Sequence, residues 1–447
     1  MTEHFPVQRR RRGVILSPQG WQRLQAAEQQ AADHNNAGKP YTLDQLGERT
    51  GLSPNTITKV RRRRLAVDRQ TLESYFNALD LTLVATDYIS VDADHPTQRQ
   101  PQKPLQGQVP LDSNFYIERP PYEFLASEEV LQPGALVRIK SPRQFGKTSL
   151  MARVLAAAHS RGCKGVVLNL QLADAAMFTD LTRFLRWFCA VVTRDLQLPE
   201  RLDEHWHDVF GSSYNCTDYF EQYLLSTLDS PLVLALDETD RIFNYPAIAS
   251  DFFGMLRAWY EKSKYGNGNS SIWQRLRLMV LYSSESYLPL NLSGSPFNVG
   301  LLLELPPFTL EQVQDLAQRY GLESSEYALE LMNLLGGIPY LTQLALHHLS
   351  SRNLTLPEFL QAVQNEGIFD AYLRKQLSYL LPSPDLLSDL KQVVLSPTPV
   401  ELNPIRAFQL QSLGLIQLSN LQAQPACRLY RTYFSQVLPI LSQESEQ

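Results

Sequence analysis

The chain has 447 residues, of which 44% are hydrophobic and 19% charged, a composition typical of globular proteins with two or three domains. No apolar run reaches the roughly 18 residues of a transmembrane helix, and the arginine-rich start lacks the apolar stretch of a secretory signal. Four cysteines and eight histidines are scattered without metal or redox spacing. We therefore expect a cytoplasmic protein without a cysteine- or histidine-based metal site.

The net charge of −5 is distributed unevenly along the chain. Residues 1–70 contain 13 Lys and Arg against 6 Asp and Glu, which gives +7 and leaves −12 for the remainder. A basic N-terminal region on an acidic protein predicts that this region alone contacts a polyanion.

Residues 41–60 have the composition and spacing of a helix-turn-helix, within an all-α domain that we place at residues 1–90. Thr42 is expected to cap the first helix, Gly51 to make the turn, and Ser53 with Pro54 to begin the second helix. Residues 71–81 are expected to form a further packing helix of the same domain.

The second of these helices is expected to present its polar face to DNA, with Ile57 and Val60 directed into the core. The arginine runs at 9–12 and 61–64 are suited to pairing with phosphates. An alternative is that the domain docks a protein, although an adaptor would not require the arginine runs. The predicted DNA-binding residues are Asn55, Thr56, Thr58, Lys59, Arg61, Arg62, Arg63 and Arg64.

Residues 91–112 are rich in Pro and Gln and lack apolar periodicity, so they are predicted to be a linker. Five continuously apolar runs then alternate with helical stretches, a pattern typical of a parallel sheet covered on both faces. These runs predict an α/β core at 113–308, and they occupy residues 136–140, 166–170, 232–237, 276–283 and 299–305.

Beyond the core the pattern becomes helical, and Thr309 with Gln312 predicts a reciprocal cap at the start of a helical lid, residues 309–382. Residues 383–447 combine two short helices with a strand-like return, which fits a winged helix. Such a module can either bind DNA or pack on the core. Its lack of conspicuous basic charge favours packing.

The segment SPRQFGKTSL, residues 141–150, follows the first predicted strand and opens a helix, as a phosphate-binding loop does. In such a loop Lys147 contacts the β- and γ-phosphates and the Thr148 hydroxyl binds Mg²⁺. Ser141 replaces the usual first glycine, which puts the affinity and turnover in question more than nucleotide binding itself. The predicted contacts are Ser141, Arg143, Gln144, Phe145, Gly146, Lys147, Thr148 and Ser149.

Two later strand ends complete the expected ATP site. Asp237 would bind Mg²⁺ through its water shell, and Glu238 would polarise an attacking water as general base. The next strand ends at Ser283 and Ser284, where a polar side chain can sense the γ-phosphate. Glu238, Lys147 and Ser284 are therefore the predicted catalytic residues.

In order along the chain, NFYIERPPYEFL, LQPGALVRIKSPRQFGKTSLM, LVLALDETDRIF, LRLMVLYSSESY, SPFNVGLLLELPPFTLEQV and LLGGIPYLTQLAL resemble the AAA-like domain of cyanobacterial multidomain regulators. That domain is related to the STAND and origin-recognition-type ATPases. The resemblance covers residues 112–440. Family members often carry Ala or Gly in place of Ser141. The N-terminal domain resembles Cro/repressor-type helix-turn-helix domains fused ahead of such ATPases.

The resemblance implies an ASCE-type α/β P-loop NTPase core with strand order 5-1-4-3-2, a helical lid and a C-terminal winged helix. It also implies that Tyr116 to Arg119 lies near the adenine, and that Gly337 and Pro339 contact nucleotide from the lid. Arg241 and Arg257 are candidate arginine fingers. The alternative is that each is an ordinary surface or ion-paired arginine.

Together these features predict a nucleotide-controlled regulator in which ATP and Mg²⁺ bind between core and lid. Slow hydrolysis would reset a switch that sets self-assembly and the engagement of DNA. One alternative is a signalling or defence scaffold whose N-terminal domain docks protein. Another is an ATPase that acts on DNA through its main body.

Overall fold

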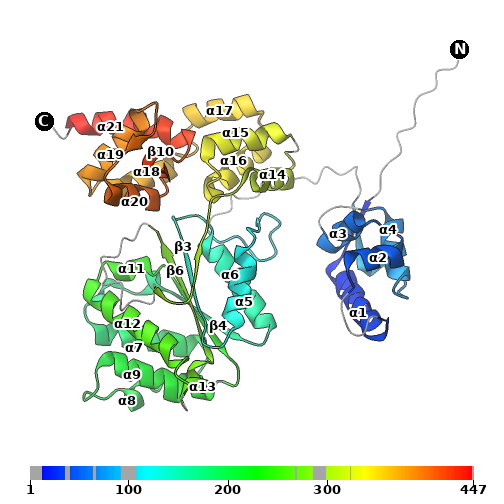
Figure 1. Ribbon diagram of the computed structural model, residues 1–447, viewed down its shortest axis with the longest axis horizontal. Helices are drawn as coiled ribbons and strands as arrows, with labels where there is room; N and C mark the ends of the chain where they lie inside the picture. The colour runs from blue at the N-terminus through cyan, green and yellow to red at the C-terminus, as the bar shows by residue number, and fades with distance from the viewer. Residues whose placement is uncertain are drawn as a thin grey trace. The chain divides into compact units, whose positions relative to one another are not determined.

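The computed structural model describes residues 13–35, 41–63, 67–91, 107–266, 269–284, 298–322 and 324–444. The chain divides into two compact units, Met1–Gln102 and Lys103–Gln447, each of which is described by itself (Figure 1). No helix within the described residues is long and apolar enough to cross a membrane.

The N-terminal unit combines four helices with a two-stranded antiparallel ribbon, so the prediction of an all-α domain is wrong in this respect. Val14 and Leu16 of the first strand are buried among the helices, whereas Gly13 and Ile15 are less buried. The sequence did not reveal these strands, because four residues are too few to show the alternation of a strand. The partner strand also lies more than 70 residues away in sequence. The elements are β1 (Gly13–Leu16), α1 (Pro18–Asn35), α2 (Leu43–Thr50), α3 (Pro54–Arg62), α4 (Arg69–Asn77), a 3₁₀ turn (Ala85–Asp87) and β2 (Tyr88–Val91).

Helices α2 and α3 begin at the predicted capping residues, and α2 ends at the predicted turn. The Thr42 hydroxyl accepts a hydrogen bond from the Gln45 amide, and the Gln45 side chain accepts one from the Thr42 amide. Gly51 ends α2 in the left-handed conformation at φ 70°, and Ser53 caps α3 through the Thr56 amide. Ile57 and Val60 are buried as expected, and so is Leu46 of α2.

A five-stranded parallel sheet forms the centre of the C-terminal unit, in the order β4-β5-β6-β3-β7. Numbered within the sheet, this order is 2-3-4-1-5, which confirms the predicted 5-1-4-3-2 arrangement. All five predicted runs are strands: β3 (Leu136–Ser141), β4 (Lys164–Asn169), β5 (Leu232–Asp237), β6 (Leu276–Ser283) and β7 (Leu301–Glu304).

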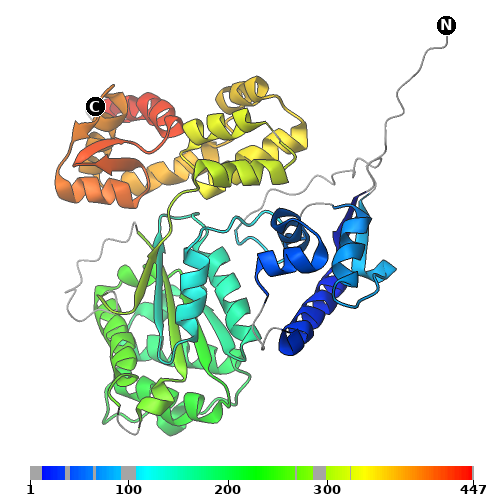
Figure 2. The same ribbon diagram turned by 45° about the vertical axis from the view of Figure 1, so that its right-hand side comes forward.

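Helices cover both faces of this sheet because alternate strand residues enter two separate cores (Figures 1 and 2). Val233 and Ala235 of β5 pack with α5 and α6, whereas Leu234 faces α7, α9 and α12. The helices of the core are α5 (Tyr122–Leu131), α6 (Lys147–Ser160), α7 (Leu181–Asp195), α8 (Leu202–His205), α9 (Ser212–Asp218), a π-helical turn (Tyr219–Leu224), α10 (Leu225–Thr227), α11 (Asp240–Phe243), α12 (Pro246–Lys262) and α13 (Ser270–Trp273).

A helical lid follows β7, and the predicted reciprocal cap of Thr309 and Gln312 is present at its start. The lid lies over the carboxyl edge of the sheet, together with a C-terminal module with which it shares one hydrophobic core (Figures 1 and 2). The lid comprises α14 (Leu310–Arg319), α15 (Ser325–Leu335), α16 (Pro339–Arg352), α17 (Leu356–Asn365) and α18 (Asp370–Leu380).

The C-terminal module alternates helices with a three-stranded antiparallel sheet and packs on the core. The Ser284 hydroxyl donates to the Ser412 carbonyl at 2.7 Å, and Gly414 approaches Pro142 so closely that an added Cβ would lie 3.2 Å from the ring. For residues 383–447, the lack of conspicuous basic charge favoured packing on the core over DNA binding. Its elements are α19 (Pro384–Leu395), β8 (Val400–Glu401), α20 (Pro404–Ser412), β9 (Ile416–Ser419), β10 (Gln422–Pro425) and α21 (Arg428–Glu444).

Candidate nucleotide-binding site

A pocket of about 360 Å³ lies where the carboxyl ends of β3, β5 and β6 meet. Its walls come from the loop between β3 and α6, from residues 107–119, and from lid helices α16 and α18. This edge is where open parallel sheets place their ligands. Four cationic side chains line the pocket against two carboxylates, so an anion is the ligand its charge favours: Arg119, Arg143, Lys147 and Lys375 against Asp237 and Glu238.

The loop from Ser141 to Ser149, which we call the P-loop, turns without requiring a glycine at its first position. Ser141 is the last residue of β3, pairs with Ser283 of β6 and is fully buried. The left-handed turns fall at Gln144, with φ 65°, and Gly146, with φ 88°. Ser141 therefore keeps an extended backbone that any residue adopts, and its serine introduces no backbone strain.

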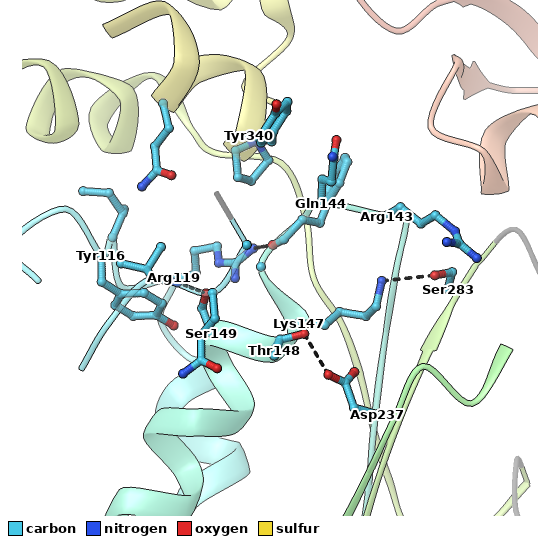
Figure 3. A pocket seen from close by; sticks show the side chains of 18 of the residues that line it. Tyr116, Arg119, Arg143, Gln144, Lys147, Thr148, Ser149, Asp237, Ser283 and Tyr340 are labelled. Carbon is cyan, nitrogen blue, oxygen red and sulfur yellow. Dashed lines mark hydrogen bonds between the residues drawn. The ribbon is translucent and has the colours of Figure 1, made fainter. Parts of the chain in front are cut away.

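Helix α6 begins at Lys147, and its N-cap residue, Gly146, has no side chain to cap the first amides. Uncapped amide groups at a helix N-terminus are suited to binding phosphate oxygens. The Lys147 ammonium donates to the carbonyls of Ser141, at 3.0 Å, and Pro142, at 3.1 Å, and lies 3.4 Å from the Ser283 hydroxyl (Figure 3).

Ser283 lines the pocket, whereas Ser284, the predicted sensor residue, does not. Successive residues of an extended strand point in opposite directions. Ser283 consequently contacts Lys147, whereas Ser284 turns to the Ser412 carbonyl in the C-terminal module.

Thr148 and Asp237, the two residues predicted to bind a metal, contact each other. The Thr148 hydroxyl donates to an Asp237 carboxylate oxygen at 3.1 Å (Figure 3). Burial, and then the neighbouring Glu238, raises the pKa of Asp237, against the opposing effects of the Glu238 amide, the Thr148 hydroxyl and Lys147. A hydroxyl and a carboxylate are oxygen ligands of the kind that Mg²⁺ prefers.

Glu238 lies at the pocket wall in a left-handed conformation, φ 55°, that non-glycine residues seldom adopt. Its carboxylate accepts a hydrogen bond from the Gln171 side chain at 3.3 Å. Glu238 directly follows Asp237, and both residues line the pocket.

Tyr116 and Arg119 both line the pocket. The Tyr116 hydroxyl donates to Glu123 at 2.7 Å, and burial with the Glu123 charge raises the pKa of Tyr116. Arg119 reaches the P-loop itself, because its guanidinium donates to the Phe145 carbonyl at 2.7 Å. The end of the predicted linker also contributes, since residues 107–109 line the pocket and the Val109 amide donates to the Ser149 hydroxyl.

Of the two lid residues predicted to contact nucleotide, Pro339 lines the pocket and Gly337 does not. Gly337 instead joins the lid to the core, because its carbonyl accepts the Phe308 amide at 2.8 Å. Several pocket residues were not identified from the sequence, where aromatic and amide side chains look like ordinary core or surface: Phe115, Phe308, Tyr340, Gln343 and Lys375.

The candidate arginine fingers both have local partners. Arg241 donates to the Gln171 carbonyl at 2.8 Å, and Arg257 pairs with Glu261 one helical turn along α12. Neither lines the pocket.

The predicted DNA-binding residues are not equally available. Lys59 and Arg63 are exposed, whereas the hydroxyls of Thr56 and Thr58 are hydrogen-bonded near the start of α3. Arg61 forms an ion pair with Glu28 of α1 and donates to the Tyr75 hydroxyl, so it is committed within the unit. The side chains of Asn55 and Arg62, and all of Arg64 and residues 9–12, lie outside the described residues.

Comparisons with known proteins agree with this architecture. A family model described as an AAA-like domain matches residues 104–436. The Walker-type ATPase PABY2304 of Pyrococcus abyssi has a similar fold, with a TM-score of 0.50 at 14% identity over 71% of this chain and 96% of that one. The ORC1 protein of Aeropyrum pernix, solved in complex with DNA, has a TM-score of 0.37 at 15% identity over 75% and 97%.

A curated relative matches at the level of sequence. It is an uncharacterised WD repeat-containing protein of Synechocystis sp. (strain ATCC 27184 / PCC 6803 / Kazusa), 25% identical over 226 residues. The match covers 48% of this chain and only 18% of the length of that relative.

Proposed function

The chain belongs to the AAA-like domain family, and from this premise we propose that it is an ATP-dependent regulatory switch. ATP binds with Mg²⁺ in the pocket between core and lid and is hydrolysed slowly. The observation that carries the proposal is the Thr148–Asp237 pair, with a hydroxyl-to-carboxylate distance of 3.1 Å, beside Lys147 at the uncapped start of α6.

The pocket residues fit a nucleoside triphosphate. Gly146 leaves room at the P-loop turn, since a side chain there would lie 3.2 Å from the Arg119 guanidinium and would be strained at φ 88°. Lys147 and the first amides of α6 would hold the phosphates. Phe115, Tyr116 and Tyr340 offer aromatic surface for the base.

Thr148 and Asp237 would hold Mg²⁺, which when bound neutralises charge on the phosphate oxygens. Glu238 would orient a water and accept its proton as the water attacks. Ser283 would hydrogen-bond near the terminal phosphate, because it already contacts the Lys147 ammonium.

Occupancy of the pocket would set how three parts of the C-terminal unit are arranged: the core, the lid and residues 107–119. Residues 107–119 lie between core and lid: Arg119 bonds the P-loop, and the Phe115 carbonyl accepts from Gln343 of α16. A ligand that contacts all three walls favours the arrangement in which they close around it. We propose that this state controls self-association.

The N-terminal unit is proposed to engage DNA through α3 and the flanking arginines. Support comes from the exposure of Lys59 and Arg63 and from the +7 charge of residues 1–70. Docking of a protein partner by the same helices is the competing function.

The experiment is DNA affinity and oligomeric state measured with and without ATP and Mg²⁺. Fluorescence anisotropy with a duplex of mixed sequence reports binding, and light scattering reports mass. If the protein is a switch, ATP should change the DNA affinity, the oligomeric state or both in the wild type. It should change neither quantity in Lys147→Ala. No response to ATP, in a protein that binds ATP, would refute the switch. Salt-insensitive or absent DNA binding would favour the protein-docking function.

A further inference from the structure

Arg119 is a buried cation that lies against the P-loop. Its exposed fraction is 3%, and one guanidinium nitrogen donates to the Phe145 carbonyl at 2.7 Å. Another lies 3.2 Å from the point that a Cβ on Gly146 would occupy. Its Nε is buried and has no hydrogen-bond partner among the described residues.

The Glu123 carboxylate hydrogen-bonds the backbone of Arg119 and not its guanidinium. Both oxygens of Glu123 accept the Arg119 backbone amide at 2.9 Å, and one also accepts the Tyr116 hydroxyl. Within the described part of the chain, no ion pair within 4.0 Å involves the Arg119 side chain. The Phe308 ring, 5.7 Å from the guanidinium carbon, supplies only a cation–π contact.

An unneutralised buried charge is unfavourable for the folded protein, and buried charges are ordinarily paired. Arg277 shows that an unpartnered Nε is not by itself a mark of a ligand site. It too is buried, at 7%, and bonds only to backbone carbonyls, but it lies outside the pocket. Arg119 differs because it lines the pocket against the loop that would hold phosphates.

We propose that Arg119 is a positioning residue of the P-loop whose charge is neutralised by the phosphate chain of the bound nucleotide. It fixes the Phe145 carbonyl and so holds Gly146 and the start of α6 toward the pocket. This inference rests on the proposed nucleotide binding, and it assigns Arg119 to the phosphates, where the family resemblance implied the adenine. The folded protein without nucleotide carries the unfavourable charge, which bound phosphate relieves.

The test compares Arg119→Met, which removes the charge with little change in volume, with Arg277→Met as the matched buried control. Melting temperature and binding are measured with three probes: ATP with Mg²⁺, inorganic tripolyphosphate and adenosine. Arg119→Met should melt at or above the wild-type temperature without ligand. It should bind ATP and tripolyphosphate about 10- to 100-fold more weakly, the range for loss of a charge-assisted contact. Adenosine binding should be unchanged.

Arg277→Met should leave all three affinities at wild-type values. Arg119→Lys keeps the charge and should retain tripolyphosphate binding within about tenfold of wild type, which tests the inference even if Arg119→Met does not fold. Wild-type tripolyphosphate affinity in Arg119→Met, an equal loss of adenosine binding, or a greater loss in Arg119→Lys would overturn the inference. These failures are distinct from failure of the proposed function, in which the wild type would bind ATP no better than Lys147→Ala.

Discussion

Replacing Gly337 with alanine is expected to weaken the junction of lid and core. Gly337 lies between α15 and α16 with φ 71°, and its carbonyl accepts the Phe308 amide at 2.8 Å. A Cβ at this position would lie 2.2 Å from the Phe308 carbonyl oxygen, which is backbone and cannot rotate aside.

The magnitude follows from three contributions to the free energy of unfolding. A left-handed conformation costs a non-glycine residue about 1–2 kcal/mol. Loss of the Phe308–Gly337 hydrogen bond costs about 1 kcal/mol. Separating the overlapping backbone costs about 1–3 kcal/mol, as overpacking does. Gly337→Ala should therefore destabilise the protein by about 3–6 kcal/mol, the sum of these contributions.

Urea unfolding of Gly337→Ala and Gly162→Ala separates strain from steric overlap. Gly162 has φ 82°, but an added Cβ there would meet no atom within 4 Å. Gly162→Ala should therefore lose only the conformational contribution of about 1–2 kcal/mol. Equal losses in the two variants would refute the reasoning. A loss of ATP affinity without a loss of stability in Gly337→Ala would restore the ligand role that the family resemblance implied.

Three further predictions concern chemistry and DNA. Glu238→Gln should bind ATP as the wild type does but hydrolyse it about 10²- to 10⁴-fold more slowly, in a phosphate-release assay, and unchanged turnover would remove Glu238 as the base. Burial and Glu238 raise the folded-state pKa of Asp237, so the wild type loses stability as pH rises above the ordinary value of 3.8 and its buried carboxylate ionises. In thermal melts without nucleotide, Asp237→Asn should not show this pH-dependent loss of stability. It should also lose the Mg²⁺-dependent stabilisation by ATP. Equal pH profiles of stability in the wild type and the variant would contradict this prediction. Replacing Lys59 and Arg63 with alanine should lower DNA affinity and reduce the salt slope by about 2, whereas Arg374→Ala should not; an unchanged slope would exclude these phosphate contacts.

The sheet and the P-loop were predictable because their signals are local. Continuous apolar runs identify buried parallel strands whatever surrounds them, and all five were found. The caps of α2, α3 and α14 could likewise be predicted, since a capping side chain bonds an amide two or three residues away. The strand order came from the family resemblance, because apolar runs do not specify which strands are neighbours.

The features of the site that the sequence did not reveal depend on the direction of side chains and on partners far away in sequence. At the end of β6 the choice between Ser283 and Ser284 depends on which face meets the P-loop, and a one-residue shift reverses it. Arg61 is predicted to contact phosphate, and nothing in its sequence neighbourhood indicates the ion pair with Glu28, 33 positions earlier. Gly337 has the sequence of a ligand element, but only its closeness to Phe308 reveals a junction.

The pocket wall formed by residues 107–119 could not be predicted from composition. A Pro- and Gln-rich stretch reads as a linker, yet its end is held by Ser149 and by Arg153, which donates to the carbonyls of Val109 and Pro110. These partners lie on α6, about 40 residues away, so their effect is tertiary.

The most direct test of the central claim is the affinity of the full chain for ATP with Mg²⁺, measured by titration calorimetry in wild type and Lys147→Ala. The wild type should bind ATP saturably, and the variant should bind it at least about tenfold more weakly, as removal of a charge-assisted phosphate contact requires. Arg374→Ala is the control, because Arg374 is exposed, pairs with Asp370 and does not line the pocket. Wild type that does not bind ATP, or Lys147→Ala that binds it equally well, would contradict the account.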